Sequence, residues 1–274
     1  MKNKPNKTRE RVQIQSSSLS RFKSVCQDLS LAMRGTDIDY TTARLKRAIL
    51  FLALPMVLEM AMESIFVVVD VFFVAKLGPE ATAAVGLTDS IITVVYAVAV
   101  GLTMAVTAMV ARRIGEKNPE RASQTTVQAI CIGIAISILI SLIGIFKSHS
   151  ILKLMGASDE IIQIGAGYTT ILIGGSSTIM LLFIINAVFR GAGDAVIAMR
   201  VLWFANLVNI VLDPCLIFGW GPFPELGVTG AAIATTTGRG LGVIYQLVIL
   251  FRGRSRIILK KRHLNLNLKT ELCT

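Results

Sequence analysis

The sequence predicts an all-α integral membrane protein built as a bundle of six transmembrane helices. Three observations carry this prediction: the apolar composition, the length of the apolar runs and the distribution of the positive charges. Hydrophobic residues make up 53% of the 274 residues, and the mean hydropathy is +0.66. A chain of this size and composition is too apolar to be an ordinary soluble domain.

Six apolar runs reach the roughly 20 residues that a membrane helix needs. The connections between them are short, which favours an up-and-down bundle. The fourth run is long enough to tilt, or to begin as an interfacial turn. The six expected spans are residues 48–75, 87–111, 123–147, 158–189, 195–219 and 227–251.

Positive charge is concentrated in one set of alternate connections. Lys and Arg number 11 in residues 1–47, four in 112–122, two in 190–200 and seven in 252–274, whereas the other connections hold only three. Because cytoplasmic connections carry the excess of Lys and Arg, we expect a multi-pass protein of the cytoplasmic membrane with both termini in the cytoplasm. The net charge of +11 then reflects topology and contact with anionic lipid, and no nucleic-acid partner is expected.

The two ends of the chain differ from its middle. Residues 1–46 are polar, basic and rich in Ser, without the apolar segment of a signal peptide, and are expected to form a disordered cytoplasmic tail. Residues 47–252 contain the six spans, and residues 253–274 form a second basic cytoplasmic tail. The cysteines have no paired spacing and no neighbouring His, so no disulfide, metal centre or cofactor is expected. They are Cys26, Cys131, Cys215 and Cys273.

The first span carries three carboxylates, Glu59, Glu63 and Asp70. At about 100° per residue, all three and Pro55 point within about 40° of the direction of Glu59. An ionised side chain near the bilayer centre costs at least about 2.5–3.5 kcal/mol, so this stripe is expected to face a cavity and to exchange protons. Pro55 is expected to kink the helix. The alternative is three unrelated acids near the helix ends.

The fifth span stacks Asn209 and Asp213 one helical turn apart, with Asn206 before them. Their oxygen atoms suit a hard monovalent cation or a shared proton and do not suit zinc, which prefers His or Cys. Pro214 follows directly and loosens the helix, so a freed carbonyl group can help to coordinate an ion. Interhelical hydrogen bonding is the alternative for these amides.

The sixth span opens with small residues at 227–235, which let helices approach closely. Thr235 and Arg239 follow on one face. A lone Arg in mid-membrane needs a partner, and we expect Arg239 to neutralise Glu63 or Glu59.

The fourth span has Tyr168 near its start and Asn186 near its end. Both are expected to line the cavity, although Tyr168 also fits an interfacial aromatic belt. The Gly-Gly-Ser-Ser sequence at residues 174–177 is expected to be a bendable point in this span.

Several short motifs occur in an order and spacing that resemble the multidrug and toxic compound extrusion (MATE) family over about residues 44–255. They are Leu54-Pro55, Val69-Asp70, Ala75-Lys76-Leu77-Gly78-Pro79, Ala111-Arg112-Arg113-Ile114-Gly115-Glu116, Met155-Gly156-Ala157, Tyr168, Phe189-Arg190-Gly191-Ala192-Gly193-Asp194, Asn209-Ile210-Val211-Leu212-Asp213-Pro214 and the run from Gly227 to Thr235.

The resemblance implies one lobe, the N-terminal one, of a twelve-helix transporter that exports organic, often cationic, compounds in exchange for H⁺ or Na⁺. It implies that Asp70, Asn209, Asp213 and Thr235 form the cation-coupling site, the first three holding Na⁺ if sodium is the coupling ion. Tyr168, Asn186 and Pro55 also match family positions. The family usually has proline where Ser177 and Ala198 stand. A second lobe is expected to follow residue 260, so the chain looks truncated.

Other functions remain as alternatives to a drug exporter. One is a non-transporting fragment, or a half-transporter that pairs with a second lobe or with another copy of itself. A flippase for lipid-linked sugars is a second. The third is an intramembrane aspartyl protease, because Gly191-Ala192-Gly193-Asp194 fits its Gly-x-Gly-Asp pattern. The second acid of such a protease should follow a tyrosine, whereas Asp70 follows Val69, so no enzyme activity is expected.

Overall fold

The computed structural model describes residues 45–253, 255 and 257, with the side chains of 45–48 and 50 left aside. These residues are helical or form short connections, and no β-strand occurs among them. The two predicted tails, 1–46 and 253–274, lie almost entirely outside the described residues. The chain divides into two units after Val57, and the packing described below is that of the second unit.

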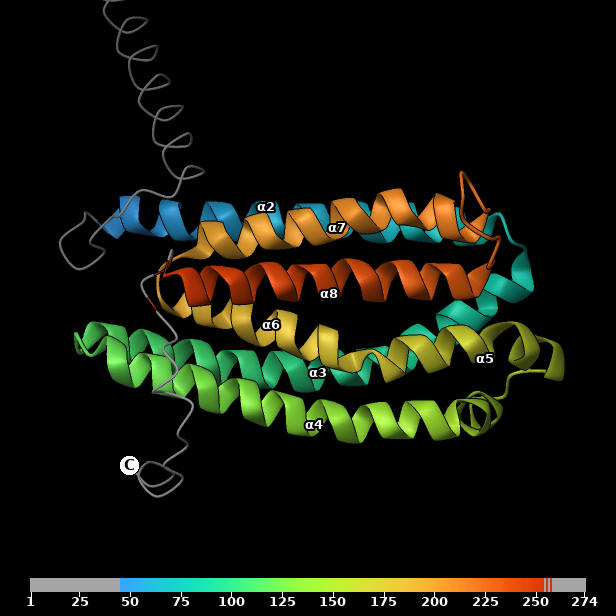
Figure 1. Ribbon diagram of the computed structural model, residues 1–274, viewed down its shortest axis with the longest axis horizontal. Helices are drawn as coiled ribbons and strands as arrows, with labels where there is room; N and C mark the ends of the chain where they lie inside the picture. Colours follow the sequence, from blue (N-terminus) through green and yellow to red (C-terminus); the bar gives the residue numbers. More distant parts are fainter. Residues whose placement is uncertain (1–44, 254, 256, 258–274) are drawn as a thin grey trace, which may run out of the picture. The chain divides into compact units, whose positions relative to one another are not determined.

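Seven helices account for the six predicted spans (Figure 1). Within residues 45–253, five stretches are long and apolar enough to cross a membrane: α3, α4, α5 with α6, α7 and α8. The first predicted span lies in α2. The helices are α2 (Leu45–Ala75), α3 (Pro79–Gly115), α4 (Pro119–Leu154), α5 (Asp159–Gly174), α6 (Ser176–Gly191), α7 (Ala195–Ile217) and α8 (Val228–Arg252).

Helices α3 and α4 extend beyond the predicted spans 87–111 and 123–147, because local signals start each helix outside the apolar run. Pro79 and Pro119 stand in the first turns of α3 and α4, where the fixed φ of proline fits and its missing N–H has no intrahelical partner to lose. The Asn118 side chain accepts a hydrogen bond from the Arg121 N–H at 3.1 Å, which caps α4.

The fourth predicted span, 158–189, is interrupted where the sequence predicted a bendable point. Helix α5 ends at Gly174 and α6 begins at Ser176. The Gly175 N–H donates to the Ile171 carbonyl oxygen at 2.7 Å, and a Cβ atom at Gly175 would lie only 2.8 Å from that same oxygen. The absence of a side chain at residue 175 is therefore what allows this junction.

Helices α3 to α8 run up and down (Figure 1), and buried apolar residues form a cluster near each end of these helices. The first cluster joins the end of α3, the start of α4, the end of α6, the start of α7 and the end of α8, and includes Val110, Phe189 and Leu250. The second joins the opposite ends and includes Val74, Ile92 and Ile217. Polar side chains lie between and beside these two clusters.

Helices α7 and α8 pack closely because small residues of α8 face the α7 backbone. A Cβ atom at Gly230 would collide with the carbonyl group of Leu216, and one at Gly238 would lie 2.7 Å from the Ala205 carbonyl oxygen. The predicted role of the small residues at 227–235 in close helix packing is thereby confirmed.

The first described residues after α8 contact the bundle. The Ser255 hydroxyl donates to Asp194 Oδ2 at 2.8 Å, and Ile257 is buried in the first apolar cluster. Asp194 lies in the turn between α6 and α7, so this contact joins the segment after α8 to that turn.

Candidate functional site

Three of the predicted coupling residues meet between α7 and α8. The Asn209 Nδ2 group donates to Thr235 Oγ1 at 3.0 Å and lies 3.4 Å from Asp213 Oδ1. Asn209 and Asp213 are one helical turn apart, so they share a face of α7, and Thr235 approaches that face from α8. All three side chains are buried, and Asp213 has no exposed surface.

Asp70 completes this group from α2. Its carboxylate lies near enough to Asp213 for the two charges to interact, and it is half-buried. Three buried oxygen atoms here accept no hydrogen bond from the described residues: Asp70 Oδ1, Asn209 Oδ1 and Asp213 Oδ2. Buried polar atoms are nearly always partnered by protein or ordered water, so three acceptors in one region can take a proton, a cation or a water molecule. We call these four residues the coupling cluster.

Arg239 does not make the ion pair that the sequence predicted. Its Nη2 group donates to the Tyr96 hydroxyl at 2.6 Å, and the guanidinium carbon lies 5.7 Å from the centre of that ring. No ion pair joins Arg239 to a carboxylate within the part of the chain that the structure describes. Glu63 lies within electrostatic range of Arg239, so the neutralisation of Glu63 stays a prediction, whereas the direct hydrogen-bond partner of Arg239 is Tyr96 of α3.

Tyr168 is buried in the second apolar cluster with Val74 and Ile92. It has only 3% of its surface exposed, so its ring faces the interior of the bundle. Asp70, Asp89 and Arg239 all lie within electrostatic range of its ring hydroxyl.

Asp89 of α3 is a charged neighbour of the coupling cluster that the sequence analysis did not single out. It interacts electrostatically with both Asp70 and Arg239, and its side chain is exposed. The sequence signal for this residue was its position near the start of the predicted span 87–111, because a carboxylate within a membrane span is costly unless it is paired or faces water.

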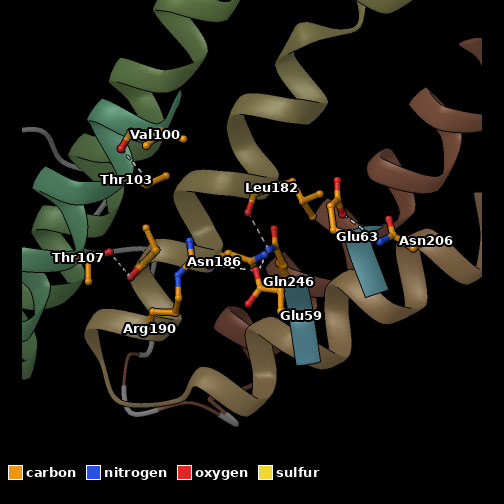
Figure 2. Close-up of polar contacts among 11 residues, drawn as sticks. Glu59, Glu63, Val100, Thr103, Thr107, Leu182, Asn186, Arg190, Asn206 and Gln246 are labelled. Atoms are coloured by element: carbon orange, nitrogen blue, oxygen red, sulfur yellow. Dashed lines mark hydrogen bonds and ion pairs between the residues drawn. The ribbon is translucent and has the colours of Figure 1, made fainter. Parts of the chain in front are cut away.

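The two other acids of α2 have partners that the sequence did not predict (Figure 2). Arg190 Nη1 of α6 lies 3.0 Å from Glu59 Oε1 in an ion pair. Asn206 Nδ2 of α7 donates to Glu63 Oε2 at 3.0 Å, which confirms the interhelical hydrogen bond considered as the alternative for Asn206. The stripe of acids on α2 therefore faces α6 and α7.

Asn186 bonds to a residue that the sequence analysis missed, Gln246 of α8 (Figure 2). Gln246 Nε2 donates to Asn186 Oδ1 at 2.7 Å and to the Leu182 carbonyl oxygen at 3.1 Å. Gln246 has no exposed surface, and its Oε1 atom accepts no hydrogen bond from the described residues. A single neutral amide within an apolar helix gave little signal in the sequence.

The remaining predicted groups lie as follows. Pro55 stands inside α2, which is helical on both sides of it, and the kink remains a prediction. Cys131 and Cys215 are free thiols, whereas Cys26 and Cys273 lie outside the described residues. No group of three His, Cys, Asp or Glu side chains that could hold a metal ion is found in residues 45–253, 255 and 257. The protease motif residue Asp194 lies in a turn.

Comparisons with known proteins identify the family to which the chain is similar. The MatE family model matches residues 55–215. A FAD transporter of Shewanella oneidensis is 30% identical over 194 residues, 71% of this chain and 43% of that protein. A probable multidrug resistance protein NorM of Thermotoga maritima is 28% identical over 208 residues, 76% of this chain and 45% of that protein.

A solved structure of a multidrug resistance MATE family transporter in an outward-facing conformation is also similar. It has 28% sequence identity and a TM-score of 0.75, and the similarity covers 86% of this chain and 50% of that one. The chain thus spans about half the length of the relatives it matches. These findings confirm the resemblance and the all-α membrane fold, and the family consists of transporters, not enzymes. This chain belongs to the MatE family of membrane transporters.

Proposed function

We propose that the chain forms the N-terminal lobe of an exporter in the cytoplasmic membrane, with both termini in the cytoplasm. Export of small, mainly cationic and amphiphilic organic compounds is coupled to the entry of H⁺ or Na⁺. The observation that carries this proposal is the coupling cluster, in which Asp70, Asn209 and Asp213 each present a buried oxygen atom without a partner.

The chemistry of the cluster suits a proton or Na⁺ equally. Carboxylate, amide and hydroxyl oxygens are ligands for hard cations, and Thr235 adds a hydroxyl group 3.0 Å from Asn209. A proton on Asp70 or Asp213 relieves the repulsion between the two carboxylates, and a sodium ion held by Asp70, Asn209 and Asp213 does the same. In either case the bound ion changes the electrostatic interaction of α2 with α7, and α2 rearranges around Pro55.

The substrate class follows from the charges around the cluster. Asp70, Asp89 and Asp213 lie in this region with Arg239 as the opposing charge, which favours a cation over an anion. The names of the relatives support small organic compounds, since they include a probable multidrug resistance protein and a FAD transporter.

A complete substrate path needs a second lobe, because the relatives are about twice as long as the matched region. That lobe is either a C-terminal half or a second copy of this chain. Two copies with the same charge distribution insert in the same orientation, so they pair around an axis along the membrane normal. Chemical cross-linking in membranes distinguishes a dimer from a monomer.

The test is efflux of ethidium from cells that lack their own drug pumps. The chain is expressed alone and together with the C-terminal half of a MATE relative. Asp213→Asn is expected to abolish efflux at unchanged protein level, whereas Asp159→Asn, an exposed acid at the start of α5, is expected to retain it. Efflux that survives Asp213→Asn would refute the proposed coupling role.

Ion binding is measured separately on the purified chain in lipid nanodiscs. Calorimetry with Na⁺ at constant pH is expected to show binding that Asn209→Ala weakens, if sodium is the ion. Release of protons on substrate addition, without a sodium response, identifies a proton-coupled protein. A chain that shows neither response does not carry the coupling site.

A further inference from the structure

A second polar group lies apart from the coupling cluster, at the opposite half of the bundle. It consists of Glu59 on α2, Asn186 and Arg190 on α6, and Gln246 on α8, and we call it the α6 polar layer (Figure 2). Asn186 and Gln246 neighbour the first apolar cluster, which contains Leu182 and Val243. The coupling cluster adjoins the second one.

The unpartnered buried atoms of the described residues fall into these two groups. All five are oxygen acceptors: three belong to the coupling cluster, and the other two are Glu59 Oε2 and Gln246 Oε1. Glu59 is 8% exposed and Gln246 is 0% exposed, so neither atom is freely solvated. An acceptor buried without a donor costs about 1–3 kcal/mol, and one donor shared between the two acceptors would remove both penalties.

The two atoms belong to side chains that meet the same face of α6. Gln246 bonds to Asn186 at 2.7 Å, and Glu59 pairs with Arg190 at 3.0 Å. Asn186 and Arg190 are four residues apart, which places them about 5–6 Å from each other on one helix face. Figure 2 shows Glu59 beside Arg190 and Gln246 beside Asn186.

We propose that Glu59 and Gln246 form a second proton-binding site of this lobe, separate from the coupling cluster. A proton taken from water bonds to Glu59 Oε2, and the resulting O–H group donates to Gln246 Oε1, so that both unpartnered acceptors are satisfied at once. Glu59 Oε1 continues to accept from Arg190 Nη1, now as part of a neutral carboxylic acid. The Arg190 side chain is 21% exposed and provides the side from which water reaches the site.

The charges around the site are few. Arg190 on α6 and Glu63 on α2 are the charged groups that face Glu59. The neighbouring contacts from α7 and α8 are neutral: the Trp203 indole donates to the Leu58 carbonyl oxygen at 3.2 Å, and Gln246 presents an amide. The positive charge of Arg190 therefore opposes protonation of Glu59, and the negative charge of Glu63 favours it.

Occupancy of the site changes how firmly α2 is held. Between Leu58 and Glu63, three polar contacts bind α2 to α6 and α7: those of Trp203, Arg190 and Asn206. Met60 of the same segment is 71% exposed, so apolar packing adds little here. Protonation turns the Arg190 contact from an ion pair into a hydrogen bond between a guanidinium group and a neutral acid, which loses the attraction between two opposite charges, and α2 is released more easily.

Infrared spectroscopy of the purified chain in lipid nanodiscs tests the site without any need for transport. As the pH is lowered, we expect the carbonyl stretching band of a protonated carboxyl group that disappears in Glu59→Gln and persists in Glu63→Gln and Asp213→Asn. Gln246→Leu is expected to shift the band, because the acceptor of the proton is lost. Gln246→Leu leaves the ion pair between Glu59 and Arg190 intact. The shift of the band in this variant therefore still tests the proposal if Glu59→Gln does not fold.

Hydrogen exchange of the segment around residues 58–66 tests the release of α2. The exchange is expected to be about fivefold faster when the site is protonated, and fast at every pH in Glu59→Gln, whose amide mimics the protonated acid. A carboxyl band that is unchanged in Glu59→Gln would overturn the proposal and leave water as the donor to Gln246. Loss of efflux in Asp213→Asn together with this outcome would leave the coupling proposal standing.

Discussion

Helix α8 carries a glycine, Gly238, whose missing side chain sets the distance between α8 and the coupling cluster. A Cβ atom at this position would lie 2.7 Å from the Ala205 carbonyl oxygen and 3.2 Å from Asn209 Cβ. Both atoms belong to α7, and the first is part of its backbone, so neither can rotate away. Gly238→Ala must therefore push the two helices apart.

The size of this effect follows from the contact distances. Carbon atoms pack at about 3.5–4.0 Å, so α8 has to move by roughly half an ångström or more. Overpacking of this kind costs about 1–3 kcal/mol of unfolding free energy. The same movement stretches the 3.0 Å bond between Asn209 and Thr235 towards the limit of hydrogen bonding, so ion binding is expected to weaken as well.

Gly240 provides a matched control two residues further along α8. The nearest atom to a Cβ there is the Thr178 methyl group at 3.8 Å, an ordinary van der Waals contact. Gly240→Ala gains the same helix propensity as Gly238→Ala without the clash. Its free energy of unfolding is therefore expected to lie within about 0.5 kcal/mol of that of the parent chain. Reversible unfolding in mixed detergent micelles measures both variants. Equal stabilities for the two variants would refute the reasoning.

Three further predictions concern individual contacts. Arg190→Met leaves Glu59 buried without its partner and is expected to lower the free energy of unfolding by about 3–5 kcal/mol. Glu59→Gln in the same chain is expected to recover part of this stability. Additive effects of the two substitutions in a double-mutant cycle would contradict the ion pair. Tyr96→Phe removes the acceptor of Arg239 and is expected to cost about 1–3 kcal/mol, measured by the same unfolding assay, with no change expected if another group takes the bond. Arg112 and Arg113 donate to the carboxylate of Glu116 and hold its pKa below the usual value of about 4.5. This small stabilisation is present above that pH and is lost as the pH falls through the lower folded pKa. High salt or Glu116→Gln should remove this contribution to the pH dependence of unfolding, and an unchanged pH dependence would contradict it.

The coupling cluster shows which contacts can be predicted from the spacing of residues within one helix. Asn209 and Asp213 were predicted to share a helix face because they are one turn apart, and the structure places them so. The resemblance added Asp70 and Thr235, and the structure brings both to the same region. These contacts were predictable because one helix fixes the first pair and the family pattern identifies the other two.

Arg239 shows where such reasoning fails. The sequence indicated that a buried guanidinium group needs a partner, but the direct hydrogen-bond partner is Tyr96 of α3, and Glu63 of α2 acts on Arg239 only through space. The acids of α2 bond to Arg190 and Asn206 instead. Which helix faces α8 at the level of Arg239 depends on the packing of the whole bundle, and no spacing within one segment contains that information.

The sequence by itself determined the helices and the alternation of charge between their connections. Within hydrocarbon, each backbone N–H and C=O group must bond inside its own helix, so a long apolar run has only one stable structure. Even the interruption at Gly175 was visible as a local signal.

Only the tertiary structure decided which polar side chains meet. Gln246 and Asn186 lie 60 residues apart in the sequence, and Glu59 and Arg190 lie 131 apart. These pairs form because the helices have a particular rotation and separation, which many small contacts such as those of Gly230 and Gly238 set together. A rotation of one helix by a single residue, about 100°, would give every one of these side chains a different neighbour.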